Sequence, residues 1–188
     1  MGLVNRRQLL AGGLGLGTFV AGGALARGVF STSANELPGG EADSDGPIEV
    51  ETIEAPGSEA TRLSVPTDGV MLLNFFAPPC GSCRRLMSPL ADARAELDET
   101  YGDTLTTLSI TVTPAEDDEL RQWWIDHGGD WFVGYDTDST LARAYGVVGY
   151  PVLVAVDSSG ERRWRETGVL ESSRIVRGVE RAFDKVGQ

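Results

Sequence analysis

Both cysteines of the chain lie in the segment "NFFAPPCGSC" (74–83), where Gly81 and Ser82 separate Cys80 from Cys83. A continuous apolar run precedes the pair and helical spacing of apolar residues follows it, so Cys80 is predicted to stand where a buried strand gives way to a helix. A helix N-terminus favours negative charge and lowers the pKa of a thiol placed there, and the thiolate is the attacking species. We therefore expect Cys80 to be a nucleophile in thiol–disulfide exchange and Cys83 to be the resolving thiol.

Two other uses of the cysteine pair are open. A structural disulfide is one, although stabilisation grows with the length of the closed loop and a C-x-x-C ring closes a very short one. Binding of Cu(I) by two thiolates is the other. The only histidine, His127, is predicted to lie at a helix end as a cation rather than to serve as a metal ligand. Arg84 and Arg85 follow the pair directly, and we expect both to face solvent.

From residue 48 onward, hydrophobic periodicity predicts strands that alternate with helices. Alternating residues in 48–53 and 61–65 predict a hairpin, and the unbroken apolar run at 70–77 predicts a strand buried on both faces. Further strands are expected at 104–112, 151–157 and 162–168, and helices after Cys80 as far as Tyr101 and at 114–129, 139–147 and 171–186. This order predicts an α/β domain with a central mixed β-sheet, helices on both faces and an N-terminal β-hairpin extension.

The N-terminal part of the chain predicts an export signal followed by a linker. The arginine pair at 6–7 precedes the uncharged stretch 9–26, which ends in Ala-Leu-Ala; this is the layout of an export signal, and the pair resembles a twin-arginine signal. We predict that 1–30 is either cleaved or kept as a membrane anchor, and that the acidic, Gly-, Pro- and Ser-rich segment 31–47 is a disordered linker. Both outcomes place the domain at 48–188 outside the cytoplasm, on the outer face of the membrane or secreted.

The charge balance excludes nucleic acid as a partner, because the formal net charge is −12 and nucleic-acid binding needs a basic face. Lys185 is the only lysine, so nearly all of the basic residues are arginines. An acid-rich, lysine-poor surface is suited to high salt, where repulsion among carboxylates is screened. We therefore expect a halophilic protein.

Two longer segments carry the most specific pattern in the chain. "VMLLNFFAPPCGSC" (70–83) and "LARAYGVVGYPVLVAVDSSGERRWRETG" (141–168) resemble the active-site and cis-proline segments of the thioredoxin fold, in its extracytoplasmic TlpA/ResA-like branch. The resemblance implies a thioredoxin fold over the domain and exchange of disulfides with protein thiols outside the cytoplasm. It also implies a cis-proline at Pro151 which, with Tyr150, docks the partner, and it implies no organic cofactor and no resident metal.

The same resemblance bears on the direction of electron flow and on assembly. Relatives in this branch are mostly reductants, so a protein disulfide reductase supplied by a membrane electron donor is expected. No amphipathic dimer face is evident in the sequence, so the catalytic domain is expected to be monomeric.

The chain departs from the family pattern at three positions. Asn74 stands where thioredoxins carry a buried aspartate, as is common in the TlpA-like branch, and Leu86 stands where ResA-like members often carry a glutamate. The sequence therefore identifies no carboxylate that deprotonates Cys83. Pro79 replaces the aromatic residue before the first cysteine and changes the surface that a partner meets. The Sco copper-chaperone family shares the fold and is the alternative, but it uses C-x-x-x-C with a later histidine.

Overall fold

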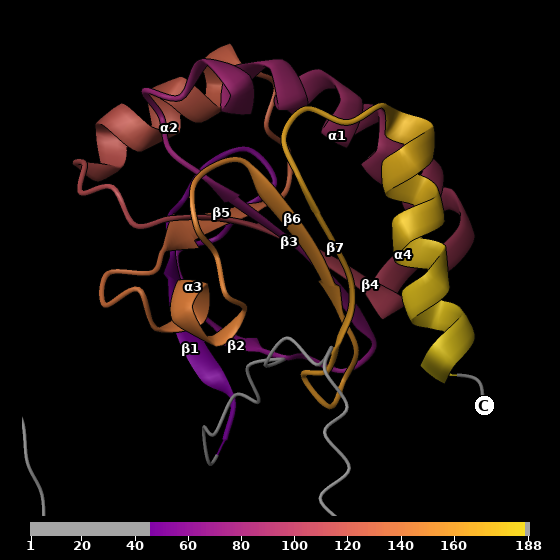
Figure 1. Ribbon diagram of the computed structural model, residues 1–188. Coiled ribbons are helices and arrows are strands. Elements are labelled where there is room, and N and C mark those ends of the chain that lie inside the picture. Colours follow the sequence, from indigo (N-terminus) through magenta and orange to yellow (C-terminus); the bar gives the residue numbers. More distant parts are fainter. Residues whose placement is uncertain (1–45, 187–188) are drawn as a thin grey trace, which may run out of the picture. The chain divides into compact units, whose positions relative to one another are not determined.

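The computed structural model describes residues 46–186 (Figure 1). The predicted export signal at 1–30 and the predicted linker, except for its last two residues, lie outside the described residues. Within the described part of the chain, no helix is long and apolar enough to cross a membrane.

A seven-stranded mixed sheet forms the centre of the domain, with the order β2-β1-β5-β4-β3-β6-β7. Strand β3 lies between a parallel neighbour, β4, and an antiparallel neighbour, β6, and is buried over its whole length. The strands are β1 (Ile48–Thr52), β2 (Arg62–Val65), β3 (Val70–Phe76), β4 (Leu105–Thr111), β5 (Phe132–Tyr135), β6 (Val152–Val156) and β7 (Arg162–Thr167). The predicted hairpin is β1–β2, and β1 also pairs with β5, so the hairpin extends the main sheet.

Helices cover both faces of this sheet unequally (Figure 1). Side chains from α1, α2 and α4 share one core with one face of β3, and α3 packs with the other face. The helices are α1 (Gly81–Tyr101), α2 (Asp117–Asp126), α3 (Thr140–Ala144) and α4 (Ser172–Val186), with a short 3₁₀ turn, η1 (Gly102–Thr104), after α1. Successive side chains of a strand point to opposite faces, which is why an apolar run such as β3 supplies both cores. The predicted α/β class with a mixed central sheet and helices on both faces is therefore confirmed.

Two helices are shorter than predicted: α2 ends at Asp126 rather than at residue 129, and α3 spans Thr140–Ala144 rather than 139–147. α2 begins at Asp117, three residues after Pro114, because Glu116 is still extended at its N-cap (φ −72°, ψ 147°). Three acidic side chains fill the first turn of α2, where they oppose the positive end of the helix dipole.

The turn between β6 and β7 is organised by the buried carboxylate of Asp157. It accepts hydrogen bonds from the backbone N–H groups of Ser159 and Glu161, from the Ser159 hydroxyl and from the Arg163 guanidinium. Burial by itself raises the pKa of Asp157, but the bonds to Ser159, Arg163 and Glu161 outweigh it, so the net pKa is lowered below the usual 3.8.

We expect Asp157→Asn to lower the free energy of unfolding by about 2 kcal/mol at pH 7, since it removes hydrogen bonds to a charged acceptor. Because the folded-state pKa is lowered, the charge of Asp157 stabilises the fold above pH 3.8, and this contribution is lost as pH falls through the folded pKa. Denaturant titrations of wild type and variant should therefore converge below pH 3.8. The exposed Asp68→Asn serves as control; a wild-type-to-Asp157→Asn gap that is constant down to the lowest pH would contradict the assignment.

Candidate active site

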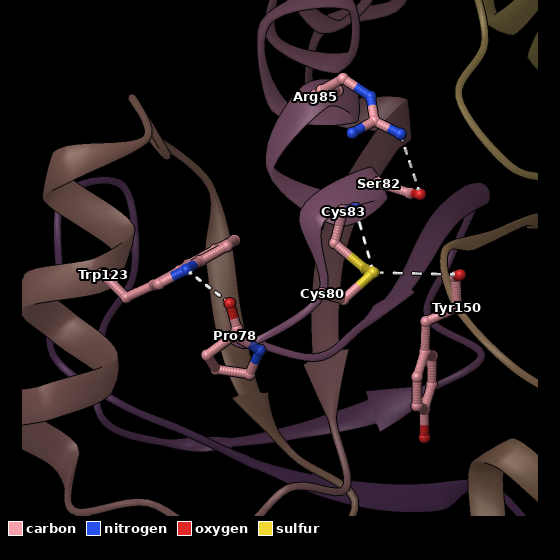
Figure 2. The surroundings of a disulfide bond; sticks show 7 residues. All are labelled: Pro78, Cys80, Ser82, Cys83, Arg85, Trp123 and Tyr150. Atoms are coloured by element: carbon pink, nitrogen blue, oxygen red, sulfur yellow. Dashed lines mark hydrogen bonds between the residues drawn. A yellow bond between two sulfur atoms is a disulfide. The ribbon is translucent and has the colours of Figure 1, made fainter.

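The sulfur of Cys80 lies at the start of α1, directly after the buried strand β3 (Figure 2). The backbone N–H of Cys80 donates to the carbonyl of Ala77 at 2.9 Å, which turns the chain out of the strand. Cys80 is the N-cap residue of α1 in an extended conformation, and its Sγ accepts from the backbone N–H of Cys83 at 3.1 Å. The two cysteines form a disulfide with their Cα atoms 5.2 Å apart.

The two sulfurs differ in access. Cys83 is 2% exposed and belongs to the core shared by α1 and α4, whereas Cys80 is only half-buried. An incoming thiol can therefore reach Cys80 and not Cys83. The N–H of Cys83 and the helix N-terminus both stabilise negative charge on Cys80, so Cys80 is suited to be an attacking thiolate and Cys83 to be an internal resolving group.

The structure brings Tyr150 and Pro151 to this sulfur across 70 residues of sequence. The Tyr150–Pro151 peptide bond is cis, and the Tyr150 carbonyl oxygen faces Cys80 Sγ at 3.9 Å while its ring points away (Figure 2). An oxygen disfavours a thiolate, but it is farther from the sulfur than the Cys83 N–H donor. Burial, and then the charge of Asp136, raise the pKa of Tyr150, so its phenol is neutral near pH 7. Pro151 is buried, and its carbonyl accepts from Gly168 N–H at 2.9 Å.

Asn74 lies on β3 within a buried polar group rather than against the disulfide. Its Nδ2 donates to Ser109 Oγ at 2.9 Å, and Trp131 Nε1 donates to the same oxygen at 2.9 Å. Among the described residues, Asn74 Oδ1 and Thr107 Oγ1 find no hydrogen-bond partner. An amide does not titrate, so Asn74 cannot act as a general base for Cys83.

Trp123 is a site residue that the sequence did not assign. Its Nε1 donates to the Pro78 carbonyl at 3.1 Å, two residues before Cys80, and its ring stacks on Phe76 with centroids 4.9 Å apart. The neighbouring Trp124 is fully buried, and its Nε1 donates to the Pro56 carbonyl at 3.1 Å. One indole of the pair therefore belongs to the core and the other is half-buried. The adjacent tryptophans were the only sequence signal, and nothing local places one of them against the cysteine loop.

The remaining predicted motif residues line the start of α1. Pro79 is exposed next to Cys80, and Gly81 and Ser82 open the helix between the cysteines. The Ser82 hydroxyl accepts from Arg85 Nη2 at 3.1 Å (Figure 2).

His127 lies at the C-terminal end of α2, where its Nδ1 is 2.7 Å from the Trp123 carbonyl oxygen and its ring stacks on the Trp123 indole. Within residues 46–186, no three His, Cys, Asp or Glu side chains come close enough together to hold a metal ion.

No family model and no curated protein sequence matches the chain. Solved structures do match. A secreted thiol-disulfide isomerase from Corynebacterium glutamicum is 21% identical with a TM-score of 0.61, covering 73% of this chain and 84% of its own. A putative thiol:disulfide interchange protein DsbE from Chlorobium tepidum is 19% identical with a TM-score of 0.56, covering 73% and 97%. A secreted disulfide oxidoreductase from Mycobacterium tuberculosis is 15% identical with a TM-score of 0.56, covering 71% and 94%.

These likenesses define the class of fold: the domain has the thioredoxin fold that the two sequence segments predicted. The structural neighbours are described as thiol–disulfide enzymes, and this chain places a cysteine pair at disulfide distance at the start of α1.

The bond from Trp123 to Pro78 holds the loop that leads into Cys80. The variant Trp123→Phe keeps an aromatic ring against Phe76 but loses this bond, so the loop no longer holds Cys80 firmly at the start of α1. We expect alkylation of Cys80 in the reduced protein to be about threefold slower at pH 7. Trp124→Phe removes an equivalent indole–carbonyl bond at Pro56 and is the matched control. Equal slowing in both variants would show a general loss of packing instead of an effect on the loop.

Proposed function

We propose that this protein is an extracytoplasmic thiol–disulfide oxidoreductase that acts on cysteines of other proteins through its C-G-S-C pair. The observation that carries the proposal is the half-exposed Cys80 sulfur, which accepts the Cys83 N–H at the N-terminus of α1 and is bonded to a buried partner thiol. A structural disulfide that closes so short a loop adds little stability. A role in thiol–disulfide exchange therefore explains this arrangement better than a purely structural role.

In the reducing direction, the Cys80 thiolate attacks one sulfur of a partner disulfide. The partner S–S bond breaks, the second partner sulfur leaves as a thiolate and takes up a proton, and a mixed disulfide joins Cys80 to the partner. Cys83, after losing its proton, then attacks Cys80 Sγ and closes the Cys80–Cys83 disulfide. The partner sulfur that was bound to Cys80 leaves as a thiolate and takes up a proton. Two electrons pass from the cysteine pair to the partner. The protons that Cys80 and Cys83 lose to solvent before they attack balance the two protons that the partner sulfurs take up, and the reverse sequence oxidises a partner dithiol.

Pro151 and the carbonyl of Tyr150 are the proposed docking surface for the partner segment. Their support is position: the Tyr150 carbonyl oxygen lies 3.9 Å from the accessible Cys80 sulfur (Figure 2), and Pro151 follows Tyr150 through a cis peptide bond. A membrane electron donor of the dithiol class would return the pair to its reduced state. The catalytic domain is proposed to work as a monomer.

Residues 1–30 are proposed to export the chain, through cleavage or as an anchor in the cell membrane. The secreted neighbours from Corynebacterium and Mycobacterium support this location. The formal charge of −12 supports adaptation to high salt, which a melting temperature that falls with added KCl would contradict.

Substitution of each cysteine separates the two roles. We expect Cys80→Ser to abolish reduction of a disulfide-bonded protein such as insulin, and Cys83→Ser to accumulate mixed disulfides on Cys80 that mass spectrometry detects. Ser82→Ala, which keeps both sulfurs, is the control and should retain activity. Full turnover by Cys80→Ser would refute the nucleophile assignment.

The reductase direction is tested by the reduction potential of the Cys80–Cys83 couple in high salt. We expect a value near that of thioredoxin, about −270 mV, as a protein disulfide reductase needs. A value near about −120 mV, as in strong oxidants, would overturn the reductase assignment and indicate a disulfide donor.

A further inference from the structure

Two guanidinium groups lie over the loop between the cysteines. Arg84 and Arg85 are both exposed, as the sequence predicted, but their side chains also reach back along α1. A Cβ atom built on Gly81 would lie 3.8 Å from Arg84 Nη2 and 3.8 Å from Arg85 Nη1. Arg85 is held there by its bond to the Ser82 hydroxyl. Both cations therefore lie near Gly81, the residue that follows Cys80 at the start of α1.

No ion pair within the described chain accounts for the position of these two cations. Ion pairs engage five other arginines of residues 46–186, but neither Arg84 nor Arg85 has a carboxylate partner there. The first turn of α1 also contains no acidic side chain. The N-terminus of a helix is its positive end, so two guanidiniums close to it lower the stability of the fold. This unfavourable placement has no compensating partner within the described domain.

The segments next to Tyr150 and Pro151 expose two apolar side chains. Val148 is 87% exposed and Val169 is 44% exposed, and both are among the few large apolar side chains that the described chain leaves in solvent. Val148 lies two residues before Tyr150, and Val169 follows Gly168, which is bonded to Pro151. The start of α1 thus carries two exposed cations, and the segments next to Tyr150 and Pro151 carry exposed apolar residues.

We propose that Arg84 and Arg85 select the partner: the protein acts on cysteines that lie in acidic segments of other proteins. This inference rests on the proposed function and adds its substrate class. A guanidinium binds a carboxylate through two parallel hydrogen bonds, so acidic residues flanking the partner cysteine would hold it over Cys80. Val148 and Val169 would contact apolar side chains of the same segment.

The preference comes from direct contact and not from the field of the whole protein. A chain with a formal charge of −12 repels acidic partners at long range. That repulsion is screened beyond about 10 Å at 0.1 M salt and about 3 Å at 1 M, whereas a guanidinium–carboxylate contact is screened less. The preference for acidic segments should therefore persist, and the overall rate with them should rise, as salt is increased.

The test uses the reduced full-length protein and three synthetic peptides with the same internal disulfide, flanked by aspartates, by Gly and Ser, or by lysines. We expect each arginine to favour the acidic peptide about threefold. The acidic peptide should therefore be reduced about tenfold faster than the basic peptide in 1 M KCl. In the double variant Arg84→Gln, Arg85→Gln this ratio should fall to about one. The double variant Arg84→Lys, Arg85→Lys should keep part of this ratio, because lysine retains the positive charge but cannot bind a carboxylate through two parallel hydrogen bonds.

Arg181→Gln is the matched control. Arg181 is exposed on α4 next to the segment whose Phe183 stacks on Tyr101, at the other end of α1. That end lies about 30 Å from Cys80 along a 21-residue helix. This variant should leave the rates with all three peptides unchanged.

The outcomes separate the two proposals. Equal rates with the three peptides in wild type would overturn the inference and leave thiol–disulfide exchange intact. If the double glutamine variant slowed all three peptides by the same factor, the arginines would only stabilise the Cys80 thiolate, and the inference would again be overturned. No exchange with any peptide would overturn the proposed function and this inference with it.

Discussion

The site depends on one hydrogen bond, from the backbone N–H of Cys83 to the sulfur of Cys80 at the N-terminus of α1. A helix leaves its first N–H groups without partners inside the helix, and here a cysteine sulfur supplies one of them in the place usually taken by an oxygen. The same contact caps the helix and stabilises negative charge on the sulfur. The Cys80 sulfur therefore serves both the helix and the chemistry, and substituting Cys80 also changes the cap of α1.

The sheet fixes the position of that hydrogen bond. β3 is buried on both faces and pairs with β4 and β6, so the point at which it delivers Cys80 is held from both sides. The pairing with β6 also carries the Tyr150–Pro151 bond to the sulfur. Unlike the family pattern, no aromatic residue precedes Cys80, and an indole from α2 supports the loop instead by bonding Pro78. Support for the cysteine loop thus comes from a neighbouring helix.

The start of α1 carries positive charge although the chain as a whole is strongly negative. The chain carries a formal charge of −12, yet the start of α1 carries Arg84 and Arg85 without acidic partners in the described domain. A thiolate on Cys80 is favoured by the helix N-terminus. The start of α1 therefore differs in charge from the average of the chain.

The sequence by itself determined the α/β class, the strand-to-helix position of Cys80 and nearly every element, because hydrophobic periodicity is a local pattern. The thioredoxin fold followed from the resemblance of the cysteine segment and the Pro151 segment to that family. Only the tertiary structure decided that Trp123 reaches Pro78, that the Tyr150 carbonyl faces Cys80, and that both guanidiniums lie over Gly81. These contacts join segments through packing or depend on side-chain rotamers, and neither leaves a period or a spacing in the sequence.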